Sequence, residues 1–189
     1  VGIYRVAVQG ADLVALGIVA ANTVSMPYMS KFANSNDING LERIAQKSAQ
    51  LSFFIASIVT FVFFIIGENL IVWVFGDDYI QSHLPLLLLA LGQMVHAGLG
   101  PGGTVLNMCG HEKGTLITLI LSAFINIVLN FVFIPLWGIG GAATATFISI
   151  IFRKIVIWMM VYLIYGIDSS ALGFTFKRKN TIQRTIVND

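Results

Sequence analysis

The sequence predicts an all-α membrane protein, a polytopic bundle of about five transmembrane helices. First, 57% of its 189 residues are hydrophobic and only 11% are charged, whereas soluble domains carry roughly 25% charged residues. Second, the mean hydropathy is +0.85, so the chain has too little polar surface to cover itself in water. Third, apolar runs such as LPLLLLALG (84–92) and IVTFVFFII (58–66) lack the alternation that a lipid-facing β-strand needs.

Five stretches reach the roughly 20 apolar residues that a helix needs to cross a bilayer. They cover residues 8–30, 48–75, 84–108, 114–136 and 139–165. The connections are short and no low-complexity linker divides them, so we expect one transmembrane bundle over residues 1–166 and a basic tail over residues 167–189. Because the chain starts without a methionine inside an apolar stretch, we also expect it to be a piece of a longer protein.

Basic residues are concentrated in the stretch 31–47, which we expect to be a loop, and in the tail. The acidic residues Glu68, Asp77 and Asp78 lie between the second and third spans, where the sequence has no Lys or Arg. By the positive-inside rule, the basic stretch and the tail are cytoplasmic and the acidic connection is outside. We therefore expect a multi-pass protein of the plasma (inner) membrane with a cytoplasmic C-terminal tail.

Charge and motifs limit the possible functions. The net charge of +2 is too small to indicate a nucleic-acid partner. Cys109 is the only cysteine of the sequence, so an internal disulfide or a cysteine-based metal cluster is not expected. The sequence contains no H-E-x-x-H, P-loop, G-x-S-x-G or C-x-x-C motif. We expect no catalytic residue, no metal site and no cofactor, and hence a protein that is not an enzyme.

The fourth span carries a polar stripe at helical spacing, which consists of Thr115, Thr118, Ser122, Asn126 and Asn130. Amides in hydrocarbon are costly unless they are paired, so the stripe should face other helices or a wet cavity. For Asn126 and Asn130 two interpretations stay open at this point. Their amides either bond a neighbouring helix or line a substrate cavity.

A tight hairpin is predicted directly after this stripe. Pro135 is expected to end the fourth helix, because proline cannot continue a helix without losing a hydrogen bond. Residues 138–141 (GIGG) then form the outer turn. Small side chains let two backbones approach closely, so Gly141 and Ala145 are expected to form a packing face.

The third span contains the segment GQMVHAGLGPGG, which combines polar and flexible residues. Gln93 and His96 fall on one helical face, and Gly98 and Gly102 form a G-x-x-x-G pair. Pro101 must kink or break the helix, and a bent helix can act as a hinge. An ionisable group inside a membrane suggests a functional site, although a lone His in a Gly-rich segment is more often a packed, hydrogen-bonded residue.

Three charged residues lie within the predicted spans. Asp12, in the first span, is a candidate coupling-ion or proton site. Arg153 and Lys154 fall well inside the last apolar run. We expect Lys154 to extend its amine towards the membrane surface, whereas Arg153 either does the same or points into the bundle and pairs with an acid.

Several segments together resemble the multidrug/oligosaccharidyl-lipid/polysaccharide flippase superfamily, in particular its polysaccharide-biosynthesis (O-antigen type) flippases. These segments are VGIYRVA at the start, MPYMSKF (26–32), VFGDDYIQSHLPLLLLALGQ (74–93), VLNMCGHEKGTL (105–116) and NIVLNFVFIPLWGIGGAATAT (126–146). The individual motifs are apolar and moderately specific, and their order and spacing carry the resemblance over residues 1–165. The resemblance implies that the five spans are the eighth to twelfth helices of a two-bundle flippase.

The same resemblance implies a function. Such proteins move polyprenyl-linked oligosaccharide outward by alternating access, as two bundles rock around a central cavity. The expected partners are therefore the lipid bilayer, the polyprenyl-linked oligosaccharide and an N-terminal bundle that this sequence lacks. A cationic cavity suits the pyrophosphate of the lipid carrier, and Arg5, Arg153 and Lys154 are the cations that could supply its charge.

Two other functions remain as alternatives. A drug/cation antiporter of the same superfamily would need a titratable coupling site, for which Asp12 and His96 are the candidates. A non-transporting scaffold subunit of a membrane assembly is the other alternative. The polar stripe and the kinked third span argue against a scaffold, because a scaffold has no use for a wet interior.

Overall fold

The computed structural model describes residues 2–173, and these residues fold into helices without any β-strand. The elements in chain order are α1 (Gly2–Asn34), α2 (Ile38–Phe75), the short 3₁₀ helix η1 (Asp77–Ser82), α3 (His83–Gly98), α4 (Gly102–Met108) and α5 (Glu112–Tyr165). The predicted all-α class is therefore confirmed. The division into a bundle and a tail stays a prediction, and most of the tail lies outside the described residues.

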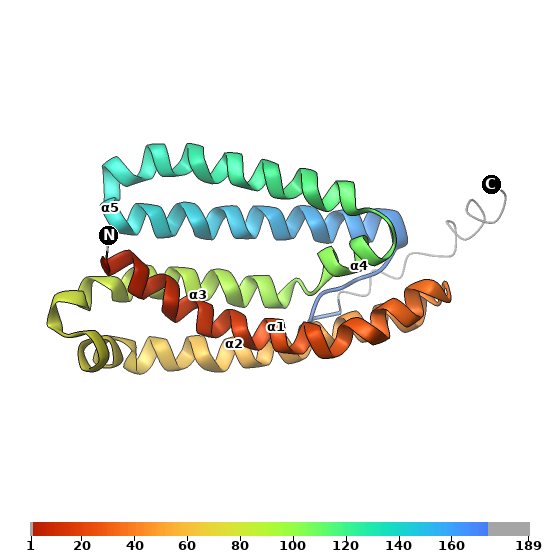
Figure 1. Cartoon of the computed structure of the whole chain (residues 1–189), viewed down its shortest axis with the longest axis horizontal. Helices are drawn as coiled ribbons and strands as arrows, with labels where there is room; N and C mark the ends of the chain where they lie inside the picture. The colour runs from red at the N-terminus through yellow and green to blue at the C-terminus, as the bar shows by residue number, and fades with distance from the viewer. Residues whose placement is uncertain (1, 174–189) are drawn as a thin grey trace.

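The helices run along the long axis of the molecule (Figure 1). By length and composition, α1, α2 and α5 can each cross a membrane, and the bent pair formed by η1–α3 and α4 is a fourth candidate. Helix α5 has 54 residues but folds back on itself at Gly138 (Figure 1), so its two arms make two passes. The chain thus passes along the bundle five times, as the sequence predicts.

The two ends of the bundle differ in charge. The α1–α2 turn, the connection between α4 and α5, and the C-terminal end of α5 lie at one end of the bundle (Figure 1). We call it the basic end because Lys31 is in the last turn of α1 and Arg43 and Lys47 are near the start of α2. The opposite end, with η1 and the turn of α5, is called the acidic end because η1 begins with Asp77 and Asp78. Which end faces the cytoplasm stays a prediction.

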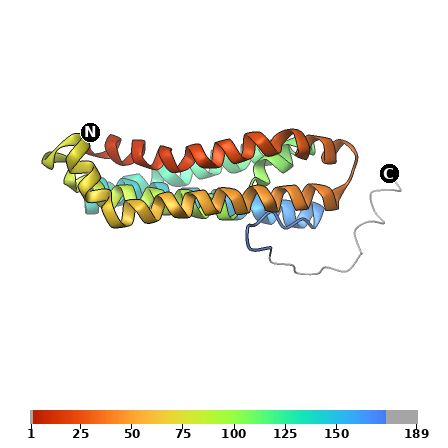
Figure 2. The ribbon, with the colours of Figure 1, turned by 90° about the horizontal axis from the view of Figure 1, so that it is seen from below.

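Helices α1 and α2 are longer than their predicted spans. Figure 2 shows them side by side along the molecule, joined at the basic end. Helix α2 begins at Ile38, where Asp37 accepts a hydrogen bond from the backbone N–H of Gly40 at 2.9 Å. A carboxylate that bonds the free N–H groups of the first turn starts a helix. The basic stretch 31–47 is consequently not a loop but two helix ends joined by a short turn.

The hairpin of α5 forms at a single residue. Gly138 has φ 55° and ψ −128°, and it is the only described residue within α5 whose backbone is not helical. The expectation that Pro135 ends the helix is wrong, because the first arm continues to Trp137. Proline removes only its own N–H bond to the carbonyl one turn earlier, and Leu136 and Trp137 keep their N–H donors, so the helix continues past Pro135 to the turn at Gly138.

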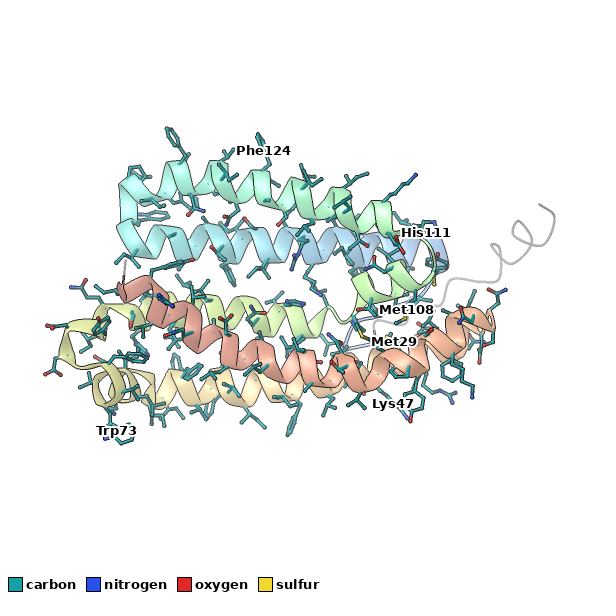
Figure 3. The ribbon with its side chains drawn as sticks, in the orientation of Figure 1. Met29, Lys47, Trp73, Met108, His111 and Phe124 are labelled. Carbon is teal, nitrogen blue, oxygen red and sulfur yellow. The ribbon has the colours of Figure 1, made fainter. Side chains whose placement is uncertain are left out.

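Several alanines are completely buried inside the bundle beside larger apolar residues, and many large apolar side chains are exposed on its outside. Ala7, Ala56 and Ala90 are completely buried between α1, α2 and α3. Trp73 and Phe131 in contrast expose 85% and 84% of their surface, and Figure 3 shows Trp73 and Phe124 pointing away from the bundle. So many exposed large apolar side chains indicate a multi-pass protein in a lipid bilayer.

Candidate functional site

A polar cavity of ≈ 260 Å³ lies where α1, α3, α4 and both arms of α5 come together. It is half-open, and its wall includes Pro101 and Gly103 from the break between α3 and α4. The polar side chains that line it are Asn22, His96, Thr104, Asn107, Thr115, Arg153 and Lys154. Such a concentration of polar groups is unusual inside an apolar bundle and makes this cavity the candidate functional site.

A second cavity, of ≈ 230 Å³, adjoins the first between the two arms of α5. The two cavities share Leu119 and Arg153. The polar side chains of the second cavity are Ser122, Asn126, Thr146, Ser149 and Arg153. We call the two cavities together the polar groove.

Two cations of α5 belong to the polar groove. Lys154 exposes only 7% of its surface and donates a hydrogen bond from Nζ to the backbone carbonyl of Gly100 at 3.2 Å. The expectation that Lys154 extends towards the membrane surface is therefore wrong. Arg153 is half-buried and makes no hydrogen bond or ion pair within residues 2–173, so its five N–H donors remain available to a ligand.

The groove is electropositive because no acid balances these cations. Among the described residues, neither cavity is lined by Asp or Glu. An ammonium group has three donors, and Lys154 uses one of them on Gly100. A buried cation without a carboxylate partner is costly, so an anion entering the groove would be bound favourably.

The acceptor of Lys154 is available because the third span is broken. Pro101 lacks an N–H group and follows Gly100, whose φ is +76°, and the helices on either side are bent by 47°. The predicted break at Pro101 is thus confirmed. Gly98 ends α3 and Gly102 begins α4, so the two glycines do not form the continuous G-x-x-x-G face that we expected.

The polar stripe of the first arm of α5 faces the second arm. Ser122 donates a hydrogen bond to the carbonyl of Ser149 at 3.0 Å, and the amide of Asn126 reaches the hydroxyl of Thr146 at 3.5 Å. Asn130 bonds only Asn126, one turn earlier. Asn126 therefore connects the two arms and also lines the groove, and a substrate-binding role for Asn126 or Asn130 stays a prediction.

The predicted packing residues of the hairpin lie between its arms or at its turn. Gly141 and Ala145 are buried, and a Cβ atom at position 141 would overlap the backbone carbonyl of Phe133 on the facing arm. Only glycine fits at this contact.

Not every predicted site residue lies in the groove. His96, Asn126 and Arg153 line it. Asp12 is exposed on α1, as is Arg5, and neither lines the groove. Gln93 is half-buried on α3 outside the cavity walls, where its side-chain oxygen is buried without a hydrogen-bond partner. Asn130 also lies beyond the cavity walls, and a functional role for any of these residues stays a prediction.

Sequence reasoning missed Asn22, Thr104, Asn107, Thr146 and Ser149, which also line the groove. Asn107 follows Thr104 by three residues, a spacing that places both on one face of α4. That signal was present in the sequence. Asn22 and Thr146 have polar neighbours in the sequence on other faces of their helices, such as Thr23 and Thr144, and only the packing of the helices reveals which of them line the groove.

The fold and the groove define a multi-pass, all-helical membrane protein with an electropositive cavity inside its bundle. The chain is similar to the probable low-salt glycan biosynthesis flippase Agl15 of Haloferax volcanii, with 27% identity over 153 residues, which cover 79% of this chain and 32% of that protein. It is also similar to the capsular polysaccharide biosynthesis protein CapF of Staphylococcus aureus, with 25% identity over 143 residues, or 74% of this chain and 36% of that protein.

The chain therefore spans about a third of the length of the curated relatives it matches. No family model and no solved structure matches it. The names of the two relatives agree with the resemblance found in the sequence, so the similarity to polysaccharide flippases is confirmed.

Proposed function

We propose that this chain is part of a membrane flippase that moves polyprenyl-linked oligosaccharide across the plasma membrane for the synthesis of cell-surface polysaccharide. The observation that carries the proposal is the electropositive groove, with Lys154 and Arg153 inside an otherwise apolar bundle. The printed names of the two relatives, a glycan biosynthesis flippase and a capsular polysaccharide biosynthesis protein, support it.

The chemistry of the groove suits an amphiphile with an anionic link between its sugar and its lipid. A guanidinium binds phosphate oxygens in pairs, and an ammonium binds them as a point charge. Hydroxyl and amide groups, such as those of Thr146, Asn126 and Asn22, continue along the groove and can bond sugar hydroxyls. Because the groove is half-open, the lipid tail can remain in the bilayer while the polar head occupies the groove.

Transport requires more of the protein than these helices. In the proposed mechanism the described bundle is one half of a two-bundle transporter, and the groove opens to either side of the membrane as the halves rock against each other. The relatives are about three times as long as the matched region, which leaves room for the second bundle. The basic end is the cytoplasmic end in this proposal, in agreement with the positive-inside rule.

The proposal is tested by deleting the complete gene in its host and restoring it with variants of the full-length protein. Arg153→Gln and Lys154→Gln each remove one cation from the groove, and Arg43→Gln removes an exposed cation outside it. We expect the deletion and the two groove variants to reduce surface polysaccharide and to leave lipid-linked oligosaccharide accumulating in the cell. Arg43→Gln should behave as the wild type.

Normal surface polysaccharide after the deletion would contradict the proposal. A drug/cation antiporter would instead show drug uptake that collapses without the ion gradient and continues without the lipid-linked precursor. The groove gives that alternative little support, because its described lining contains no acid to attract a cationic drug.

A further inference from the structure

The chain does not leave the bundle where α5 ends. Gly166 adopts a left-handed conformation with φ 67° and turns the backbone towards the bundle. The next residues are buried between the helices, with Ile167 and Ser169 fully buried and Asp168 exposing 3% of its surface. We call residues 167–171 the latch. Ile167 belongs to an apolar cluster with Leu106 and Val161. Residues 168–170 are polar and have no hydrophobic reason to be buried, so their hydrogen bonds must explain their position.

The latch supplies donors to the break between α3 and α4. A broken helix leaves backbone carbonyls without partners, and inside a membrane these carbonyls must find donors elsewhere. The backbone N–H of Ala171 bonds the carbonyl of Gly98 at 2.8 Å, and the hydroxyl of Ser169 bonds that of Leu99 at 3.2 Å. The third carbonyl, of Gly100, accepts its bond from Lys154. Three consecutive carbonyls at the break are thus satisfied by the latch and the groove lysine.

The other side of the latch is attached to α2. The side chain of Glu42 accepts a hydrogen bond from the backbone N–H of Asp168 at 3.0 Å, and the amide of Gln46 donates to the carbonyl of Asp168 at 3.0 Å. Gln50 donates in the same way to the carbonyl of Ala171 at 3.2 Å. These three residues recur every four positions on α2, so one helical face holds the latch along its length.

The carboxylate of Asp168 gives the latch its shape. Its Oδ1 atom accepts bonds from the indole N–H of Trp158 and from the backbone N–H of Ser170, both at 3.0 Å. Its Oδ2 atom and the hydroxyl of Ser170 are buried without a partner within the described chain. Buried oxygens without a hydrogen-bond donor cost free energy. The latch in its buried position therefore gains many hydrogen bonds but also carries the desolvation cost of two unpaired oxygens. Such a balance suits a segment that opens and closes.

Glycine at position 100 allows the latch to approach the break. A Cβ atom on Gly100 would overlap the carbonyl oxygen of Ser169 and would lie 3.1 Å from the Cβ atom of Ala49. Gly110 has a similar backbone, with φ +81°, but a Cβ atom there would meet nothing within 4 Å. The two glycines therefore differ in their contact with the latch and not in their backbone conformation.

We propose that residues 167–171 are a conformational latch that fixes the bend between α3 and α4 and keeps the groove closed towards the basic end. When the groove opens at that end, the latch releases its hydrogen bonds to the break and to α2. The latch acts on the wall of the groove, because Gly100 precedes Pro101 and bonds Lys154, both of which line it. This inference does not depend on the identity of the transported molecule.

The test measures access to the groove in the full-length protein. The protein is placed in lipid nanodiscs, where both membrane faces are reachable, with native cysteines replaced by serine and with the groove residue Thr104 replaced by cysteine. The rate of labelling by a charged maleimide reports the open fraction when the open state is rare. We expect Gly100→Ala to raise this rate by about fivefold or more, the effect of losing one or more net hydrogen bonds. Gly110→Ala should leave it within about twofold, because it breaks no such bond.

A second pair of variants tests the latch without backbone strain. Trp158→Phe removes the indole donor to Asp168 and keeps an aromatic ring that can stack on Tyr162. Trp73→Phe is its control, since Trp73 is exposed and far from the latch. We expect Trp158→Phe to raise the labelling rate at unchanged protein abundance, and Trp73→Phe to have no effect.

Each result of these measurements counts for or against the latch. If the Gly100→Ala protein does not accumulate in cells, the comparison of labelling rates between Trp158→Phe and Trp73→Phe tests the proposal. Equal labelling rates for Trp158→Phe and Trp73→Phe, or for both glycine variants, would overturn the proposal. The labelling assay contains no substrate, so it tests the latch alone. The latch proposal can therefore be contradicted while the transport proposal stands, and the transport proposal can be contradicted while the latch proposal stands.

Discussion

Replacing Gly141 by alanine should open the hairpin of α5, whereas the same change at its neighbour Gly140 should not. A Cβ atom at position 141 would overlap the carbonyl oxygen of Phe133, and a Cβ atom at position 140 would meet nothing within 4 Å. Both substitutions gain helix propensity, by up to about 1 kcal/mol. Only Gly141→Ala adds the penalty for overfilling a packed contact, which is about 1–3 kcal/mol. The difference between the two variants isolates this penalty, because the propensity gain cancels.

The measurement is the free energy of unfolding of the full-length protein in mixed micelles, obtained by titration with a denaturing detergent and followed by tryptophan fluorescence. We expect Gly141→Ala to be less stable than Gly140→Ala by about 1–3 kcal/mol. Equal stabilities would mean that the two arms do not meet at Gly141. The five-pass arrangement would then lose its main support, since the chain makes a fifth pass only because α5 folds back at this turn.

Two further predictions concern single side chains. Ser122→Ala removes the hydrogen bond to Ser149 and should lower the free energy of unfolding by about 0.6 kcal/mol, the average for hydrogen bonds between membrane helices. The control is Ser57→Ala, because the Ser57 hydroxyl bonds a carbonyl of its own helix. An equal loss of stability in the two variants would contradict the reasoning. Burial raises the pKa of the Cys109 thiol, against a smaller opposing effect of the Tyr165 hydrogen bond. Because the thiolate is the reactive form, Cys109 should be alkylated at pH 8 more slowly than a cysteine at the exposed position Lys113, as measured by peptide mapping, and its rate should rise as the pH is raised. Equal rates at pH 8 would refute this.

The spans were predictable because each depends on neighbouring residues alone. Apolar runs of sufficient length mark the helices, and Gly138 and Pro101 mark the turn and the break. The helix ends were less predictable, since α2 begins at Ile38 with Asp37 as its side-chain cap, inside a stretch whose charges suggested a loop. Local composition does not distinguish a charged helix end from a charged loop.

The groove and the latch depend on contacts between residues that are far apart in sequence. Lys154 points inward because a carbonyl 54 residues earlier is free to accept its hydrogen bond, and nothing in the sequence around Lys154 reveals that acceptor. Asp168 and Ser169 follow the last span and precede a basic segment, so they read as the start of a polar tail. Their burial becomes visible only when the break in the third span is placed beside them.

The position of the groove lysine and the bend of the third span are coupled, because they share one row of carbonyls. If the latch leaves, the carbonyls of Gly98 and Leu99 lose their donors, and inside a membrane the helix ends must rearrange to recover them. Gly100 moves with these residues, so the partner of Lys154 moves as well. In the proposed transport cycle, a phosphate oxygen in the groove would compete with Gly100 for the ammonium group. Binding of the anionic head would then weaken one of the three bonds at the break, and in this way the substrate itself could favour release of the latch.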